Sequence, residues 1–336
     1  MPRGLVTLVL LALALLCAAP TASARSWAQP QIQEVVELGL MGPSVAGFRP
    51  DAPLTRGALG RITANLTGKP QVVVDPDRNV TLRQLDRALV RAAGLAGPAR
   101  AFRRKVSAAG LDAPARLGTE VVARLLWLRY NHPAAKDFRE LRPHDVVNRA
   151  EAAYSTARVL DLDDGDRYYV RDLAARFSLP AFTVWKRRVL DRAVRFVGYP
   201  YIWGGTSEGR QTLFGATSRG GFDCSGFVWR VYKLEPFAGA PQLQDVLRGR
   251  TTYAMSGEFP RSQRISRSSL RPADLVFFGS RGPRSSPSEV DHMGIYLGRG
   301  WVIHSSGQGV TLVPLTGWYA DRFAWGRRPL REAGLS

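Results

Sequence analysis

The sequence GFDCSGFVWRVY at residues 221–232 places one cysteine between a polar step and an apolar run. Asp223 is a favoured N-cap residue, and apolar side chains follow Cys224 at the i+3, i+4 and i+7 positions of one helical face. The stretch therefore predicts a helix that begins at Cys224. The helix dipole would lower the pKa of a thiol in this first turn, and the unpaired Cys224 amide N–H could face an oxyanion. The alternative is a small buried side chain, a common place for free cysteine.

The first residues have the pattern of a secretory signal peptide. Arg3 precedes the apolar stretch 5–16, and the Ala-Ser-Ala sequence at 22–24 is a small-x-small cleavage pattern. We expect removal of residues 1–24 and export of a mature protein without a transmembrane segment. A lipid anchor on Cys17 is the alternative, but a leucine precedes this cysteine where such anchors have a small residue.

Loss of Cys17 would leave Cys224 as the sole thiol, because the chain has two cysteines. An intramolecular disulfide is then excluded, and a lone thiol in an oxidising compartment marks a candidate reactive residue.

The formal net charge of +19 favours a polyanionic partner. For an exported protein the available polyanions are anionic cell-wall polymers and lipid headgroups rather than nucleic acid. An arginine-rich composition can also reflect genome bias, so charge alone does not assign a function. The hydrophobic content of 45% is that of a packed globular protein and excludes general disorder.

Three stretches in the first half share one phrase. In each, a proline turn leads to an apolar residue and then to Thr or Asn, which are N-cap residues ahead of an amphipathic helix. Three such loop-helix units predict a repeat domain. The phrases are FRPDAPLTRGAL (48–59), DPDRNVTLRQL (75–85) and LRPHDVVNRAEAA (141–153), which align Leu54 with Val80 and Val147, and Thr55 with Thr81 and Asn148.

These phrases resemble S-layer homology repeats over about residues 30–160, and the match is closest at the Phe-x-Pro-x-x-x-x-Thr-Arg phrase of residues 48–56. The resemblance implies a non-catalytic, helical, wall-binding domain at 25–170. The alternative is an unrelated helical domain with proline-capped helices. The acidic stretch DLDDGDR at 161–167 is predicted as the boundary region.

The second half changes from helical to extended patterning. An apolar face with steps of four predicts a helix from Thr183 that ends at Gly198. Short β-like runs then follow, separated by segments rich in Gly, Pro and Ser, so the pattern indicates an α+β domain with a small antiparallel sheet. The runs are DLVFF (274–278), HMGIYLG (292–298), WVIHSS (301–306) and GVTLVPL (309–315).

Two of the four histidines, His292 and His304, lie in neighbouring β-like runs. A thiol nucleophile needs a base and a third polar group that orients it, so both histidines must share one face of the sheet. A two-residue turn alone would place them on opposite faces. A three-residue loop at 298–300, or a bulge, would place His304 opposite Gly294 with His292 about 7–8 Å away on the same face. We predict one of these two; satisfied strand histidines are the alternative.

The remaining histidines fall in the first half. His132 precedes a proline and His144 lies in a predicted turn, so both are predicted as surface residues rather than ligands.

The motifs of the second half resemble the NlpC family of papain-like bacterial cell-wall peptidases, in the order of that family. The resemblance implies a papain-like cysteine peptidase domain at 180–330 that cleaves peptidoglycan stem peptides, usually between γ-D-glutamate and the following diamino acid. The motifs are PYIWGG (200–205), FDCSGFVWRVY (222–232), LRPADLVFF (270–278), DHMGIYLG (291–298) and VIHSS (302–306).

The resemblance also implies roles for individual residues. Cys224 matches the nucleophile, His292 the base and His304 the third polar residue of the triad, and no metal or cofactor is needed. Substrate contacts are implied for Tyr201, Asp223 and Ser225, although Tyr201 could instead be a core aromatic. The sequence departs from the family pattern at a polar insertion, 206–221, and at a loop, 279–290, both expected near the mouth of the cleft.

The sequence thus predicts a secreted, wall-associated cysteine endopeptidase with peptidoglycan and anionic wall polymers as partners. A wall amidase or acyltransferase on the same fold is one alternative. A non-catalytic wall-binding protein is another.

Overall fold

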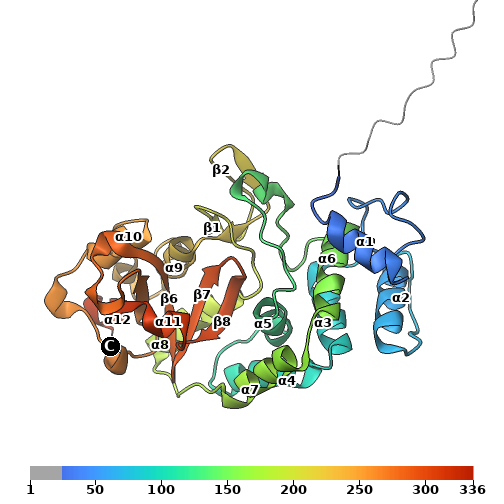
Figure 1. Ribbon diagram of the computed structural model, residues 1–336. Helices are drawn as coiled ribbons and strands as arrows, with labels where there is room; N and C mark the ends of the chain where they lie inside the picture. Colours follow the sequence, from blue (N-terminus) through green and yellow to red (C-terminus); the bar gives the residue numbers. More distant parts are fainter. Residues whose placement is uncertain (1–24, 336) are drawn as a thin grey trace, which may run out of the picture.

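The structure is a computed structural model that describes residues 25–335, so the predicted signal peptide lies outside the described residues. The first half of the chain is helical and the second half contains an antiparallel sheet with helices around it, which confirms the α+β class (Figure 1). Between residues 25 and 335, no helix has the length and apolar character needed to cross a bilayer.

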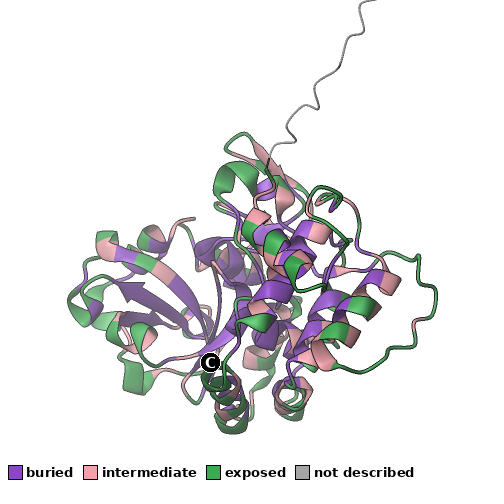
Figure 2. Cartoon of the chain, turned by 45° about the vertical axis from the view of Figure 1, so that its right-hand side comes forward, coloured by how far each residue is buried: buried purple, intermediate pink, exposed green. Residues whose placement is uncertain are grey.

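The helical half consists of short helices joined by turns. Its apolar side chains are buried between the helices, and the outward faces of the helices are exposed (Figure 2). The helices are α1 (Gln29–Glu37), α2 (Arg56–Thr67), α3 (Leu82–Ala92), α4 (Ala96–Ala108), α5 (Leu117–Leu125), the 3-10 helix η1 (Ala134–Arg139), α6 (Arg149–Leu160) and α7 (Asp164–Arg176).

The three predicted helix starts are confirmed. The Thr55 side chain accepts a hydrogen bond from the backbone of α2, and the Asn148 side chain accepts one from the backbone of α6, at 3.3 and 2.8 Å. Thr81 starts α3 in a capping box, in which its N–H donates to the Gln84 carbonyl oxygen Oε1 at 2.8 Å.

The aligned apolar residues ahead of these caps form a closed ring of backbone hydrogen bonds. Leu54 N–H donates to Val147 O at 2.9 Å, Val147 N–H to Val80 O at 3.0 Å, and Val80 N–H to Leu54 O at 2.9 Å. All three side chains are buried. The repeats therefore meet at one point, and α2, α3 and α6 leave it in three directions.

One prediction for this half is wrong, and another segment has more structure than expected. The acidic stretch at 161–167, predicted as the boundary region, contains the start of a helix, because Asp163 accepts the Asp166 N–H at 2.8 Å as the N-cap of α7. The helical part of the chain therefore continues past residue 170. His132 is buried, because aromatic rings including Trp27 enclose it and its Nε2 lies 3.0 Å from the Glu151 carboxylate.

His144 is exposed, as predicted, although its Nε2 lies 3.3 Å from the Tyr199 hydroxyl of the second half.

The second half has a five-stranded antiparallel sheet in the order β8-β7-β6-β5-β9. The four predicted strands are confirmed, whereas the edge strand β9 was not foreseen. The predicted insertion at 206–221 forms small hairpins. The elements are α8 (Val184–Arg195), β1 (Thr206–Ser207), β2 (Gln211–Leu213), β3 (Ala216–Ser218), β4 (Gly221–Phe222), α9 (Cys224–Tyr232), η2 (Pro241–Asp245), α10 (Thr252–Gly257), η3 (Arg261–Gln263), η4 (Arg267–Ser269), β5 (Leu275–Gly279), η5 (Gly282–Arg284), η6 (Pro287–Glu289), β6 (Val290–Gly298), β7 (Trp301–Ser306), β8 (Gly309–Pro314), α11 (Trp318–Asp321), β9 (Phe323–Arg327) and α12 (Pro329–Glu332).

The two halves share a packed boundary. Arg124 of α5 is buried, and its guanidinium donates to Gly198 O and, at 2.9 Å, to Gln308 O, while the Gln308 side chain donates back to Arg124 O. Nearby, the rings of Phe102 and Trp301 lie 6.1 Å apart. The boundary is therefore part of one continuous core.

Replacing Arg124 should destabilise the whole chain. In Arg124→Ala, two buried carbonyl groups lose their donor, and the buried Glu120 carboxyl loses the guanidinium whose charge stabilises its ionised form. We expect the free energy of unfolding to fall by about 3–5 kcal/mol in denaturant titrations followed by tryptophan fluorescence. The exposed control Arg171→Ala should stay within about 0.5 kcal/mol of the parent. Equal stability of both variants would show that the boundary contributes little.

Candidate functional site

Cys224 is the first residue of α9, as predicted. The Asp223 carboxylate caps this helix by accepting the Gly226 N–H, and its other oxygen accepts the Gly204 N–H at 2.9 Å. The thiol faces strand β6 and is 8% exposed. Within the described part of the chain no acceptor pairs with the Cys224 N–H, so this donor is available at the helix start.

Strand β6 contains one more residue than its partner β7 requires. Tyr296 pairs with Val302, but the next pair is Gly298 with Trp301, so Leu297 is bulged. The turn that follows has two residues, Arg299 and Gly300, with positive φ values of 49° and 78°. Of the two geometries predicted for this hairpin, the bulge is the one present.

The bulge places both histidines on one face of the sheet. Continuing the register from Ile295 and Ile303 sets His304 opposite Gly294, and His292 lies two residues along the same face. His292 Nε2 and His304 Nδ1 are 2.8 Å apart. The predicted juxtaposition of these two residues is therefore present.

A third side chain extends this contact. The Tyr319 hydroxyl of α11 lies 3.2 Å from His304 Nε2. His304 is fully buried, whereas His292 is partly exposed and contacts the rings of Phe278 and Trp318. The three polar groups form one chain from the interior to the cleft.

These two hydrogen bonds determine which ring nitrogens carry protons when His292 acts as a base. If His292 Nδ1 has a free lone pair, Nε2 carries the proton and donates to His304 Nδ1. His304 Nε2 then carries its own proton and donates to the Tyr319 oxygen. Burial raises the pKa of Tyr319, so its hydroxyl stays protonated and its oxygen can accept. All donors point the same way, which stabilises positive charge on His292.

The thiol has polar neighbours besides the histidines. The Thr252 hydroxyl of α10 lies 3.4 Å from the sulfur, and the N–H groups of Ser225 and Met293 point toward it. Met293 follows His292 in β6, so α9 meets the sheet beside the histidine pair. Among the described residues, the thiol and the His292 imidazole are not directly hydrogen-bonded.

Electrostatics keeps both groups neutral, which corrects the expected lowering of the thiol pKa. Burial, together with the Asp223 carboxylate, raises the pKa of Cys224 to about 11. Burial lowers the pKa of His292 to about 4, against the opposing effect of Asp291. The helix dipole and the nearby N–H donors are therefore weaker than desolvation in this closed arrangement.

The predicted substrate-contact residues lie around the thiol. Tyr201 is partly buried, and its pKa is raised by burial and then by its proximity to Cys224 and Asp223. Ser225 Oγ donates to Asp223 at 3.1 Å. Arg250 joins this group, since its guanidinium lies 2.7 Å from Ser225 Oγ and 3.2 Å from each Asp223 oxygen. The Asp223 carboxylate thus forms an ion pair with Arg250.

Three residues near the thiol were missed from the sequence. Arg250 lies in the irregular segment before α10, Thr252 begins the six-residue helix α10, and Tyr319 lies in a helix of four residues. None of these segments is long enough to show a hydrophobic period, so no sequence signal marked them.

The helical half also reaches toward the cleft. Strand β3 of the predicted insertion packs against η1, and Arg142 donates to the Glu208 backbone at 3.3 Å. Asp137 of η1 is close enough to influence the pKa of Tyr201. Residues 25–335 contain no group of three or more His, Cys, Asp or Glu side chains arranged to bind a metal ion.

Comparisons with known proteins agree with this geometry. Residues 198–328 match the model of the NlpC/P60 family, and residues 21–59 match that of the S-layer homology domain. The chain is 33% identical to the murein DD-endopeptidase MepH of Escherichia coli over 141 residues, which cover 41% of this chain and 44% of that protein. It is also 33% identical to a γ-D-glutamyl-L-lysine dipeptidyl-peptidase of Bacillus cereus over 148 residues, 42% of this chain and 36% of that protein.

These matches span less than half the length of either relative. A solved structure of an NlpC/P60 family protein from Bacillus cereus aligns with 46% of this chain and 43% of its own, with 26% identity and a TM-score of 0.33. The family match includes the strands that carry both histidines and the helix that carries the cysteine. Residues 198–328 are therefore similar to the NlpC/P60 family, and residues 21–59 are similar to the S-layer homology domain.

Proposed function

We propose that this protein is an exported cysteine endopeptidase that cleaves peptidoglycan stem peptides, with Cys224 as nucleophile, His292 as base and His304 as the group that orients the base. The hydrogen bond between His292 and His304, on the face of the sheet next to the first turn of α9, supports this proposal most directly. The NlpC/P60 match and the names of the relatives support the same substrate class.

The reaction would start from a neutral thiol and a neutral imidazole. As the sulfur attacks the scissile carbonyl carbon, the thiol proton passes to His292 Nδ1, and the Cys224 N–H stabilises the oxyanion. His292 then protonates the leaving amine, which leaves a thioester on Cys224. Water attacks the thioester with His292 as base, which releases the carboxylic acid and restores the thiol.

His304 and Tyr319 act on this base from behind. His304 accepts a hydrogen bond from the His292 Nε2–H group. His292 Nδ1 therefore stays unprotonated and can take the thiol proton, as the third residue ensures in other triads. Tyr319 in turn accepts from His304. Asp223, Ser225 and Tyr201 border the sulfur and are the residues we propose for substrate contact.

For the scissile bond we propose the linkage between γ-D-glutamate and the following diamino acid. The name of the Bacillus cereus relative supports this choice, whereas the Escherichia coli relative is named for a different bond. The sequence differs from the family pattern in the insertion at 206–221 and the loop at 279–290. These differences could change which bond is cleaved, so the released fragments must be identified directly.

Replacing the nucleophile should abolish cleavage. Cys224→Ala should reduce the release of stem-peptide fragments from purified peptidoglycan to background, because no other thiol lies in residues 25–335. Thr217→Ala, on the far strand of the insertion hairpin, serves as a control and should retain near-parental activity. Fragments are separated by liquid chromatography and identified by mass.

Unchanged digestion by Cys224→Ala would refute the mechanism. Products cut between sugar and peptide would identify an amidase. No digestion by the parent protein, with wall binding retained, would identify a non-catalytic binding protein.

The pH dependence of activity should show that Cys224 and His292 are both neutral before substrate binds. Because the pKa of His292 is lowered to about 4, its basic form persists well below its ordinary value of 6.5, and kcat/KM should fall only as the pH drops toward 4. Stability should decline earlier, as the pH falls from 6.5 to about 4, because the unfolded chain takes up the His292 proton over this range and the folded protein does not. Thiolate absorbance at 240 nm, with Cys224→Ala as blank, should appear near pH 11. A thiolate signal at neutral pH would contradict the neutral pair.

We also propose that the helical half, predicted at 25–170, holds the protein on the cell wall. The S-layer homology match supports this role. Exposed Arg87 and Arg91 of α3, with Arg100 and Arg103 of α4, line a cavity of about 310 Å³ that has no carboxylate in its lining. Like charges four residues apart on a helix are unfavourable, and Arg87 has no ion pair with any described residue, which fits an anionic partner.

This role can be tested by sedimentation of the full chain with purified cell walls. Arg87→Gln/Arg91→Gln should weaken binding about tenfold, because two charged contacts are lost. The matched control Arg171→Gln/Arg284→Gln removes the same charge from exposed positions elsewhere and should bind within about twofold of the parent. Equal weakening of both variants would indicate a response to net charge rather than a site.

A further inference from the structure

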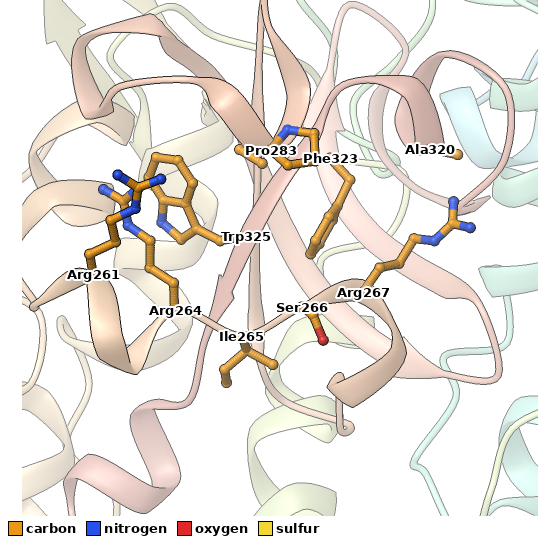
Figure 3. A pocket seen from close by; sticks show the side chains of 10 residues that line it. Arg261, Arg264, Ile265, Ser266, Arg267, Pro283, Ala320, Phe323 and Trp325 are labelled. Carbon is orange, nitrogen blue, oxygen red and sulfur yellow. The ribbon is translucent and has the colours of Figure 1, made fainter.

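A pocket separate from the catalytic residues lies along the edge strand β9. It has a volume of about 420 Å³ and is lined by the segment before η4, by Pro283, by Ala320 of α11 and by residues of β9 (Figure 3). Pro283 belongs to the loop at 279–290 that departs from the family pattern. None of the residues proposed for catalysis lines this pocket.

The pocket is cationic. Arg261, Arg264 and Arg267 line it, and no carboxylate does. None of the three forms an ion pair with another residue in 25–335, although most arginines around the catalytic site are paired. The Arg264 guanidinium lies 3.5 Å from the centre of the Trp325 ring, and its pKa is lowered by burial and by the neighbouring charge of Arg261.

Two buried donors in this pocket have no acceptor. Trp325 is 2% exposed, and its indole Nε1 has no hydrogen-bond partner among residues 25–335. The same is true of Arg264 Nε. In Figure 3 the indole nitrogen and the guanidinium groups of Arg261 and Arg264 lie on one side of the pocket, with Arg267 on the other. Buried donors usually have an acceptor, and an anion beside the unpaired guanidinium groups would supply one.

We propose that this pocket binds a phosphate group carried by an anionic cell-wall polymer. Unpaired guanidinium groups suit an anion with several oxygens, because they bind phosphate through paired hydrogen bonds. Arg261 and Arg264 lie together beside Trp325, whose buried indole N–H is a further unpaired donor. The polymer as the source of the phosphate rests on the proposed wall-associated function; phosphate binding itself does not.

The surroundings of the pocket favour a polymer over a membrane surface. The large apolar side chains that line it, Phe323 and Trp325, are buried, and Ile265 is only partly exposed. The lining therefore offers no protruding apolar group that could enter a bilayer. A concave, cationic site could accept one charged group of a polymer chain that continues on either side.

The pocket is also adjacent to the catalytic residues through α11. Tyr319 contacts His304, and the next residue, Ala320, lines the pocket. A polymer held here would keep the peptidoglycan to which it is attached close to the catalytic residues. The pocket is thus an accessory substrate site of the same domain.

Binding should be measured by calorimetry on full-length Cys224→Ala protein, so that the result does not depend on catalysis. Inorganic phosphate is titrated at constant ionic strength, with chloride as the reference anion. Adding Arg261→Gln/Arg267→Gln should weaken phosphate binding about tenfold or more, because two charge-assisted contacts are lost. The control Arg104→Gln/Arg171→Gln removes equal charge from exposed positions of the helical half and should change phosphate affinity less than about twofold.

A second variant addresses the buried donor. Trp325→Phe removes only the indole N–H and part of the ring, and circular dichroism confirms that it is folded. We expect severalfold weaker phosphate binding. Unchanged affinity in both Trp325→Phe and the Arg261/Arg267 variant, or phosphate binding no tighter than chloride, would overturn the site.

The source of the phosphate is tested with a poly(glycerol phosphate) polymer and with phosphatidylglycerol vesicles. The proposal expects polymer binding that is lost in the Arg261/Arg267 variant. Arginine-dependent binding to vesicles but not to the polymer would overturn the polymer assignment. In the protein with Cys224 intact, Arg261→Gln/Arg267→Gln should still cleave a short soluble stem peptide, so failure of this proposal is distinguishable from failure of the peptidase assignment.

Discussion

One additional residue in a strand determines whether this domain can have a catalytic base. Side chains alternate along β6, so a regular hairpin with a two-residue turn would direct the imidazoles of His292 and His304 to opposite faces. Bulging of Leu297 restores the parity and permits the 2.8 Å contact between them. Everything proposed about proton transfer depends on this local irregularity, because neither histidine alone would be more than a buried strand residue.

Much of the fold could be predicted from the sequence because its signals are local. N-cap residues such as Thr55 and Asn148 start helices wherever they precede an apolar period, and runs such as DLVFF form strands. The choice between a longer loop and a bulge could not be made, because glycines near position 300 satisfy both. Strand β9 was missed, since its short run has no turn signal that separates it from its surroundings.

Tertiary packing explains the remaining errors. His132 precedes a proline in what looks like an exposed turn, but distant aromatic residues cover it. Cys224 has every local feature of an acidic thiol, yet neighbouring elements bury it and reverse the direction of its pKa shift. Local sequence encodes a donor or a dipole, whereas desolvation depends on segments far away in the chain. The sequence could therefore predict that His292 and His304 lie together, but it could not predict the ionisation of the thiol beside them.

The ring of backbone hydrogen bonds in the helical half has a consequence for how such a domain can vary. In a linear stack of repeats, an end unit can be lost with the loss of a single interface. Here each of the three units donates one backbone hydrogen bond and accepts one. Deleting any unit would therefore break two of the three hydrogen bonds and expose the buried residues at the centre. The number of units is consequently closed at three, and changes in size are confined to the segments that join them.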